Sequence, residues 1–219
     1  MKRRRSPQGL ERTSSRREPK KRILVMCEGT VTEVQYFSGI KDHFRALPVE
    51  IGTCDIDGCG RDPLGVVRAA EKRRDTAHRK AQRQGDAYLA YDEVRAVVDV
   101  DEHTSLEAAI RRARESGIRL AISTPCFEIW LLRHFQECSA ALTSAIVQNK
   151  IHRYVPGYEK HLPEDFPYGE HGTARRRART ADPHHDSPNR KGRNPSTNAW
   201  LTIDAIAASG QRDAKSSRW

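Results

Sequence analysis

Apolar and polar positions alternate in a repeating order along the first 140 residues. Four short apolar runs are bounded by charged or turn-forming residues, which is typical of strands that are buried on both faces. These runs cover residues 23–27, 49–54, 94–98 and 118–123. Apolar residues at helical spacing follow each run, at 34–44, 64–85, 106–115 and 126–135. This order predicts an α/β fold in which helices flank a parallel sheet with right-handed crossovers.

Composition divides the chain into three parts. Residues 1–22 are rich in Arg, Lys, Ser and Pro with almost nothing to bury, which predicts a disordered basic arm. Residues 23–140 form the predicted α/β domain, with a Gly- and Pro-containing loop at 55–63. Residues 141–219 predict a loop-rich basic extension that packs on the domain through a short helix at 197–208. Its turn-rich and loop segments are 154–160 and 169–198.

Basic residues outnumber acidic ones. The 219 residues include 39 Lys and Arg against 29 Asp and Glu, a formal net charge of +10. Such an excess favours a polyanionic partner, and its clustering indicates nucleic acid, either DNA or RNA. Few aromatic residues lie among the clustered charges, so we expect contacts to phosphates with weak sequence preference. The predicted contact residues are Arg175, Arg176, Arg177, Arg179, Arg190, Lys191 and Arg193.

The cysteines and the hydropathy bear on cellular context. An odd number of cysteines, five, without a signal sequence predicts reduced thiols in a cytoplasmic protein. Cys54 and Cys59 have no second pair at a suitable spacing, which argues against zinc. No apolar stretch reaches membrane-spanning length, so we expect no membrane partner. The oligomeric state is not set by the sequence, and a homo-oligomer stays open.

Acidic residues follow two of the predicted strands. Glu28 ends the first run, where Gly29 permits a sharp turn, and Asp99 and Asp101 end the third. Open α/β sheets place their sites at the carboxyl ends of strands, and residues two apart in a strand share a face. Three carboxylates at one edge repel one another unless a hard divalent cation joins them, and Mg²⁺ or Mn²⁺ takes such oxygen ligands. A cation there would polarise a phosphoryl oxygen and favour a hydroxide nucleophile, as in phosphodiester cleavage.

These acids resemble the Toprim arrangement of topoisomerases, primases and OLD-type nucleases, in which aspartate-x-aspartate follows a glutamate-glycine pair. Further segments look like motifs of the RloB/AbiLii family. They are Cys27, Glu28, Gly29, Thr32, Glu33, Tyr36 and Phe37; Pro125, Cys126, Phe127, Glu128, Trp130, Leu131, Leu132, His134 and Phe135; Tyr158, Glu159 and Lys160; and Asn194, Pro195, Ser196 and Thr197. The resemblance spans residues 22 to 205.

The resemblance implies a Toprim-like fold and a role in bacterial antiphage or restriction-linked systems, including abortive infection. Family members are often encoded beside an AAA-type ATPase. The chain has no Walker A pattern, so such an ATPase would be a separate polypeptide. By position, Glu28 matches the Toprim glutamate, as ligand or general acid/base, and Asp99 and Asp101 match the metal-binding pair. Arg95 inside the third strand departs from the apolar pattern. Asp92 and Glu93, just before it, are alternative candidates for the metal ligands.

Other candidate residues keep two interpretations each. Glu33 either stabilises its first helical turn through the helix dipole or supports the acidic site. Glu128 either caps its helix or pairs with Lys160 to orient a substrate phosphate. His134 is predicted as a core histidine, and the histidines at 184–185 as polar loop residues that could bind a metal.

These features predict a Mg²⁺-dependent Toprim-type nuclease that cleaves nucleic-acid phosphodiesters in antiphage defence, beside a partner ATPase. Two alternatives stay open. One is a non-catalytic nucleic-acid-binding or regulatory module whose acidic cluster is structural. The other is a nucleotidyl or phosphoryl transferase that uses the same carboxylates on a small nucleotide.

Overall fold

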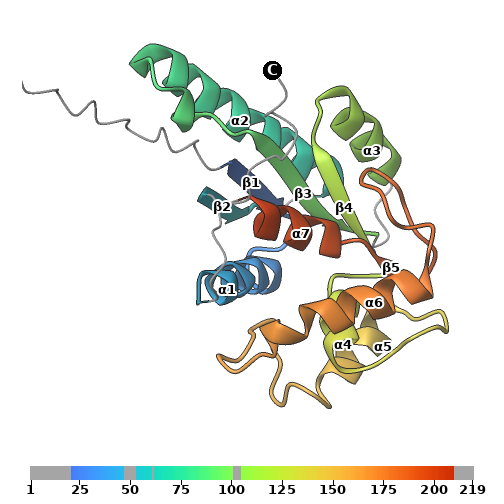
Figure 1. The fold of residues 1–219 in the computed structure, drawn as a ribbon. Coiled ribbons are helices and arrows are strands. Elements are labelled where there is room, and N and C mark those ends of the chain that lie inside the picture. Colours follow the sequence, from blue (N-terminus) through green and yellow to red (C-terminus); the bar gives the residue numbers. More distant parts are fainter. Residues whose placement is uncertain (1–20, 47–52, 61, 101–104, 210–219) are drawn as a thin grey trace, which may run out of the picture.

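A five-stranded sheet forms the centre of the part of the chain that the computed structural model describes, residues 21–46, 53–60, 62–100 and 105–209 (Figure 1). Its order is β2-β1-β3-β4-β5. The strands are β1 (Arg22–Cys27), β2 (Thr53–Gly58), β3 (Glu93–Asp99), β4 (Arg119–Thr124) and β5 (Ser196–Thr197). The first four are parallel and β5 runs antiparallel to β4. The predicted α/β class is therefore confirmed, and the carboxyl ends of the parallel strands meet at one edge.

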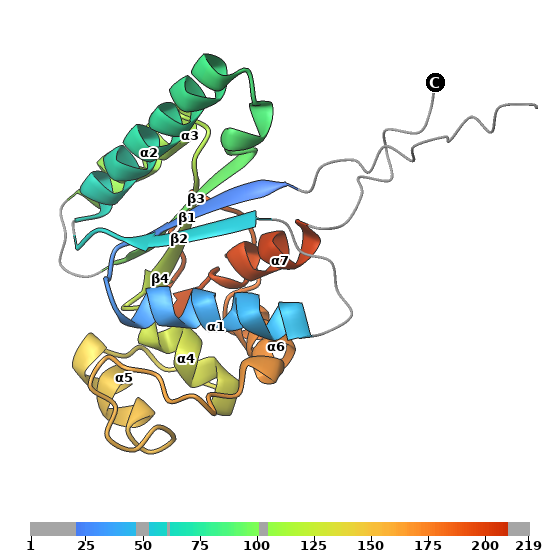
Figure 2. The same ribbon diagram turned by 90° about the vertical axis from the view of Figure 1, so that its left-hand side faces the viewer.

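Helices cover both faces of this sheet. They are α1 (Thr32–Ala46), α2 (Pro63–Gln84), α3 (Leu106–Glu115), α4 (Glu128–Phe135), α5 (Ser144–Ile151), α6 (His171–Ala181) and α7 (Trp200–Ala208), with short 3₁₀ turns at Ala87–Leu89 and Tyr168–Glu170. Figure 2 shows α2 and α3 on one face and α1 and α7 on the other. Alternate residues of β1 enter the two layers, Val25 on the α1 side and Leu24 on the α2 side. Burial on both faces explains why β1 is an unbroken apolar run after Arg22.

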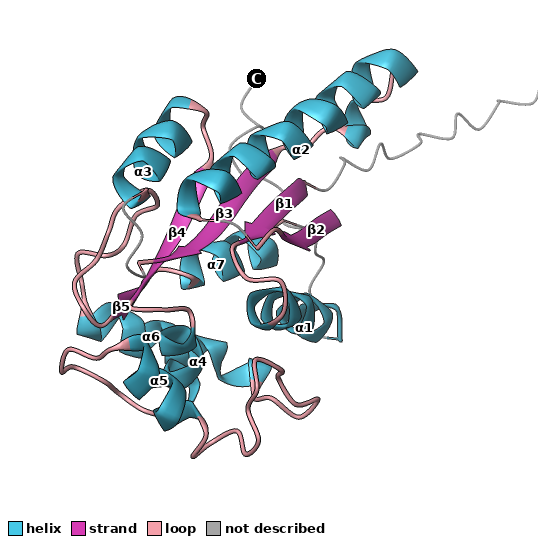
Figure 3. Ribbon diagram, turned by 180° about the vertical axis from the view of Figure 1, so that it is seen from behind, coloured by secondary structure: helices cyan, strands magenta, loops and turns pink. Residues whose placement is uncertain are grey.

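The remaining helices gather where the parallel strands end. Figure 3 shows α4, α5 and α6 beside β5. His134 of α4 is buried there, with Nδ1 3.1 Å from the Pro167 carbonyl oxygen and Nε2 3.0 Å from the Tyr36 hydroxyl. A carbonyl only accepts, so Nδ1 carries the hydrogen and Tyr36 donates to Nε2. The prediction of a core histidine is confirmed.

The second strand lies further along the chain than predicted. β2 begins at Thr53, so the prediction that residues 55–58 belong to a loop is wrong, and residues 47–52 lie outside the described ranges. Among the described strands, β2 pairs with β1 alone and forms an edge of the sheet, where polar side chains are tolerated. Asp55 accepts hydrogen bonds from Arg22 and Tyr91, both 2.7 Å long. These partners hold a polar strand that an apolar pattern cannot reveal.

The predicted loop at 169–198 is also wrong over α6. This helix buries only Ala174 and Ala178, and four of its other nine positions are arginines. Small side chains suffice because α6 packs closely on α4. The predicted helix at 197–208 begins later, at Trp200, since residues Ser196–Thr197 form β5.

Arg95 sits inside β3 without breaking it. Its side chain is buried and its Nε donates to Glu93 Oε1 at 2.5 Å, with Arg119 reaching the same oxygen at 3.0 Å. Because these acidic and basic partners accommodate Arg95, β3 continues past it and ends at Asp99, as the sequence predicts. Across the described ranges, no helix combines the length and the apolar composition that crossing a bilayer requires. The predicted basic arm at 1–22 lies outside the described residues up to residue 20.

Candidate active site

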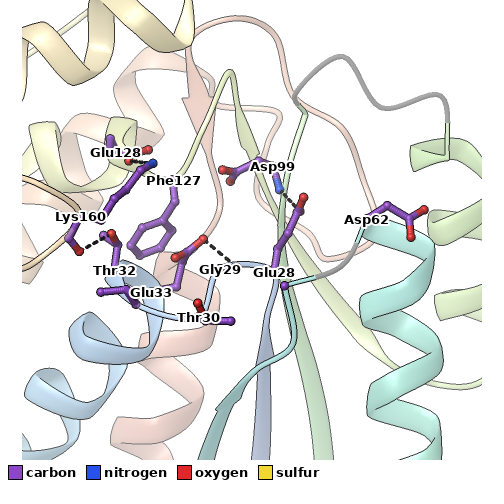
Figure 4. Close-up of a pocket in the computed structure, with 12 residues that line it drawn as sticks. Glu28, Gly29, Thr30, Thr32, Glu33, Asp62, Asp99, Phe127, Glu128 and Lys160 are labelled. Carbon is purple, nitrogen blue, oxygen red and sulfur yellow. Dashed lines mark hydrogen bonds and ion pairs between the residues drawn. The ribbon is translucent and has the colours of Figure 1, made fainter.

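A pocket of about 510 Å³ opens at the carboxyl edge of β1 and β3 (Figure 4). Five of its lining residues are acidic and one, Lys160, is basic. The lining residues are Glu28, Gly29, Thr30, Val31, Thr32, Glu33, Gly60, Asp62, Asp99, Phe127, Glu128 and Lys160. The pocket is acidic although the chain as a whole is basic, and it contains all the predicted catalytic residues in the described ranges.

The ends of β1 and β3 bring Glu28 and Asp99 together. The Glu28 amide donates to the Val97 carbonyl at 3.0 Å, which extends the pairing of these strands past Cys27. The Asp99 amide in turn donates to Glu28 Oε2 at 3.0 Å. Glu28 is thus fixed by the backbone of the neighbouring strand. Asp101, the third predicted ligand, lies outside the described residues.

The Asp99 carboxylate combines an incomplete set of hydrogen bonds with a raised pKa. Its Oδ1 atom is buried and has no hydrogen-bond partner within the described part of the chain. Burial, followed by the negative charges of Glu33, Glu128 and Glu28, holds the pKa of Asp99 well above its ordinary value. A cation in the pocket would relieve both effects, because it would accept the free oxygen as a ligand and offset the surrounding charge.

Glu33 connects the start of α1 to the turn after β1. Its Oε1 accepts the Gly29 amide at 3.2 Å, and its side chain is buried against the Gly29 Cα. A Cβ at position 29 would collide with this carboxylate, so a larger residue there would displace the Glu33 side chain. Burial raises the pKa of Glu33. The two interpretations of Glu33 are therefore compatible, because the acid in the first turn of α1 also lines the pocket.

Glu128 and Lys160 form the opposite wall. Glu128 is the first residue of α4 and is only 3% exposed, and its Oε1 accepts Lys160 Nζ at 2.8 Å and the Tyr158 hydroxyl at 3.1 Å. Burial alone would raise the pKa of Glu128, but the hydrogen bond and charge of Lys160 bring it below its ordinary value. The pair is therefore ionised, with the lysine side chain 58% exposed at the mouth of the pocket.

Two hydroxyl residues that the sequence did not single out as site residues hold this wall in place. Thr32 donates to the Lys160 carbonyl at 2.6 Å and lies 3.1 Å from the Tyr158 hydroxyl. Lys160 has a positive φ of 68°, a conformation that costs a non-glycine residue energy and persists when surrounding contacts impose it. Thr32 and Tyr158 supply such contacts. Both belong to the quoted family motifs, which is the signal that could have found them.

The family comparison covers this whole region. A model of the RloB-like protein family matches residues 23–206, from β1 into α7. The chain belongs to the RloB-like family. No curated protein and no solved structure matches it. All described pocket residues fall inside the range that the model of the RloB-like family matches.

The seven basic residues predicted to contact nucleic acid take different places in this RloB-like protein. Arg177 donates to the carbonyls of Arg133 and His134, at 2.7 and 2.9 Å, and so caps the end of α4. Arg193 donates to the Ala181 carbonyl at the end of α6. Their guanidinium groups are used for the fold. The others keep exposed or half-buried side chains; they are Arg175, Arg176, Arg179, Arg190 and Lys191.

The histidines at 184–185 are the candidate metal ligands that the sequence places outside the pocket. Among the described residues, no group of three or more His, Cys, Asp or Glu side chains could hold a metal ion. His185 is buried and its Nε2 donates to the Arg190 carbonyl at 2.9 Å, whereas His184 is exposed. The described residues thus supply two carboxylates that line the same pocket, Glu28 and Asp99, at the predicted metal position.

Proposed function

We propose that this RloB-like protein is a Toprim-type nuclease that hydrolyses nucleic-acid phosphodiesters with Mg²⁺ or Mn²⁺. The observation that carries the proposal is the buried oxygen of Asp99, which has no partner among the described residues, in the same pocket as the backbone-anchored carboxylate of Glu28. Both lie at the edge where parallel sheets place their chemistry. Desolvating a carboxylate in such company is costly unless a cation accompanies it.

The donor set fits Mg²⁺. This ion is commonly held by one or two carboxylates together with waters and substrate phosphates, rather than by a complete protein cage. Glu28 and Asp99 would hold it, with Asp101 as a third ligand. When bound, the ion would polarise a phosphoryl oxygen and lower the pKa of a bound water.

The other residues act on the substrate and on the site itself. Lys160 presents a half-exposed ammonium at the mouth and would bind a non-bridging phosphate oxygen. Glu128 orients that ammonium and keeps it charged, because the buried carboxylate raises the pKa of Lys160. Glu33 fixes the Gly29 turn, and its raised pKa suits it to hold or pass a proton near the reacting phosphate.

The biological setting is part of the same proposal. A nuclease in a family associated with restriction-linked genes would act in antiphage defence, with a separate AAA-type ATPase as partner. Co-purification of the tagged protein with the product of a neighbouring ATPase gene would test this partnership, and a stable complex is the expected result.

Cleavage by pure protein tests the proposed activity. Supercoiled plasmid, single-stranded DNA and RNA are incubated with Mg²⁺, Mn²⁺ or EDTA, using wild type and Glu28→Gln. We expect cleavage of at least one substrate by the wild type with metal only, and none by Glu28→Gln. The variant keeps the size of the side chain and an oxygen that can accept the Asp99 amide, so a loss of activity would reflect the lost charge. Equal cleavage by both proteins would reject the assignment.

One observation favours a second candidate function. The described residues contain no group of three metal-ligating side chains, and a two-carboxylate edge can also serve a non-catalytic nucleic-acid-binding or regulatory module. That module would bind nucleic acid in a salt-sensitive manner and leave it intact with either metal.

A further inference from the structure

A second cleft, of about 400 Å³, lies on the exposed side of α6. Its lining residues recur every three or four positions along the helix, so they share one face. They are Gly172, Arg175, Arg176, Arg179 and Thr180, with Pro183 beyond the end of the helix. Three guanidinium groups line this cleft and none of its lining residues is acidic.

The other side of α6 serves the fold. Ala174 and Ala178 are buried, and Arg177 reaches the last carbonyls of α4. Figure 1 shows α6 between α4 and α7. The helix therefore divides its arginines by face, one capping a neighbouring helix and three directed to the cleft.

Trp200 of α7 organises two of these three arginines. The guanidinium carbons of Arg175 and Arg179 lie 5.0 and 5.7 Å from the centre of its ring. Cation–π contacts of this kind hold two like charges close together at a helix surface where they repel each other. The Trp200 ring is only 6% exposed, so it is not free to stack on a base.

One carboxylate limits the positive charge of this cleft. Asp204 Oδ1 lies 3.1 Å from Arg175, and both side chains are about 40% exposed, at 38% and 42%. Arg176 and Arg179 have exposed side chains, and no carboxylate pairs with them in the described structure. Planar guanidinium groups bind phosphate oxygens well. A cleft with guanidinium groups and no open aromatic face suits a phosphate backbone.

We propose that Arg175, Arg176 and Arg179 form a docking cleft for the phosphate backbone of nucleic acid, which binds without reading the bases. This inference rests on the proposed function only in taking nucleic acid as the polyanion. The cleft binds substrate away from the acidic pocket and makes no contribution to bond cleavage.

Binding in EDTA tests the cleft independently of cleavage. Fluorescence anisotropy of labelled duplex DNA and single-stranded RNA is measured against salt for the full chain and for Arg176→Ala/Arg179→Ala. The double variant should bind about tenfold more weakly at 0.1 M salt, and its slope of log affinity against log salt should be shallower by about 1.8 for duplex DNA, or 0.9 for each lost phosphate contact. The charge-matched control, Arg68→Ala/Arg111→Ala, removes two exposed arginines from α2 and α3 and should change the slope by less than half as much.

A gain of affinity provides the second test. Asp204→Asn removes the carboxylate beside Arg175 and should tighten binding about threefold at low salt, because one more guanidinium becomes available to phosphate. Glu107→Gln, the same charge change on exposed α3, should have a smaller effect. A structural role of Asp204 would not raise affinity.

The outcomes separate the two proposals. If the wild type binds in EDTA but never cleaves with metal, the proposed function fails and the cleft stands. If the α6 double variant keeps the affinity and salt slope of its charge-matched control, the docking cleft is wrong whatever the cleavage result. Equal affinity for two unrelated duplex sequences is expected, and a tenfold preference would overturn recognition through the backbone alone. Binding of inorganic tripolyphosphate without binding of any nucleic acid would overturn the choice of ligand.

Discussion

The acidic pocket and the arginine cleft on α6 differ in how each holds its charges. In the pocket, Glu128 accepts hydrogen bonds from a hydroxyl and a lysine, and Asp99 lies near the negative charges of Glu33, Glu128 and Glu28. In the cleft, Arg176 and Arg179 are exposed. Charges that are shielded from solvent interact strongly and over fixed geometry, whereas exposed charges are screened by salt. The first arrangement suits chemistry at one phosphate, and the second suits holding a long polyanion.

The largest expected effect is on cleavage, from the pocket. Asp99→Asn should reduce metal-dependent cleavage by about 10³-fold, equivalent to about 4 kcal/mol in the barrier, because it removes a charged ligand without changing size. The same variant should not destabilise the metal-free protein, since it removes a buried carboxyl whose charged form is disfavoured by burial and by three acidic neighbours. Plasmid cleavage and urea unfolding are measured in parallel. Asp165→Asn, at an exposed acid, is the control, and a variant that loses activity and stability together would indicate a structural role for Asp99 instead.

The second-largest expected effect is a loss of stability at low pH. It arises in α4, which carries a pocket residue and packs on α6. α4 carries Glu128 at its first residue and is capped by Arg177 at its end, and His134 is buried between them. Burial, assisted by the charges of His171 and Arg177 and opposed by the Pro167 carbonyl, lowers the pKa of His134 to about 4 from an ordinary 6.5.

The sign follows from which state takes up the proton. Below pH 6.5 the unfolded chain protonates this histidine while the folded protein does not, so the unfolding free energy falls as the pH decreases towards about 4. The full loss is about 3 kcal/mol. Urea unfolding from pH 7.5 to 4.5 measures it, and His134→Gln should remove this part of the dependence. An identical pH profile in the variant would show that His134 does not titrate as described.

The third prediction compares how tightly the pocket and the cleft are packed, by adding a methyl group at one glycine in each. Gly29→Ala should destabilise the protein by about 2 kcal/mol, because its Cβ collides with the Glu33 carboxylate. Gly172→Ala, on the cleft side of α6, places its Cβ in open space and should stabilise the helix by about 0.5 kcal/mol. Thermal unfolding distinguishes the two shifts. Shifts of the same sign and size would mean that the pocket is no more tightly packed than the cleft.

The smallest effect separates the two roles of arginine on α6. Arg177→Ala should destabilise the protein by about 1 kcal/mol, because two carbonyls at the end of α4 lose their donor. Arg176→Ala should leave stability within about 0.5 kcal/mol of the wild type, as for most exposed positions, and weaken nucleic-acid binding. Urea unfolding measures the stability of both variants, and fluorescence anisotropy measures their affinity for nucleic acid. The division of α6 into two faces would be contradicted by a loss of stability in Arg176→Ala and none in Arg177→Ala.

The positions of the first two pocket acids can be predicted from the sequence. Glu28 and Asp99 end largely apolar runs, and neighbouring parallel strands bring such ends to one edge, so their placement in one pocket follows from the pattern. The pairing of Glu128 with Lys160 was one of two interpretations of the sequence and is confirmed, but the hydroxyl contacts that support this pair are harder to predict. Thr32 and Tyr158 are 126 positions apart, and their contact depends on how the chain folds back beyond α5, where no periodic pattern exists.

The α6 helix shows a second limit of sequence patterns. Its apolar face consists of two alanines, so arginine density conceals its periodicity, and a loop was predicted where a helix forms. The cleft that depends on this helix, and its use of Trp200, could not be anticipated from the basic residues alone. Only their contacts show that Arg177 and Arg193 belong to the fold.

Binding of Mn²⁺ measured by electron paramagnetic resonance tests the central claim most directly, because it reports the ion itself and needs no substrate. Wild type should bind an ion that Mg²⁺ displaces, and Glu28→Gln and Asp99→Asn should each abolish that binding while the folded state persists. Retention of the same bound Mn²⁺ signal in both variants would contradict a divalent-metal site at the ends of β1 and β3.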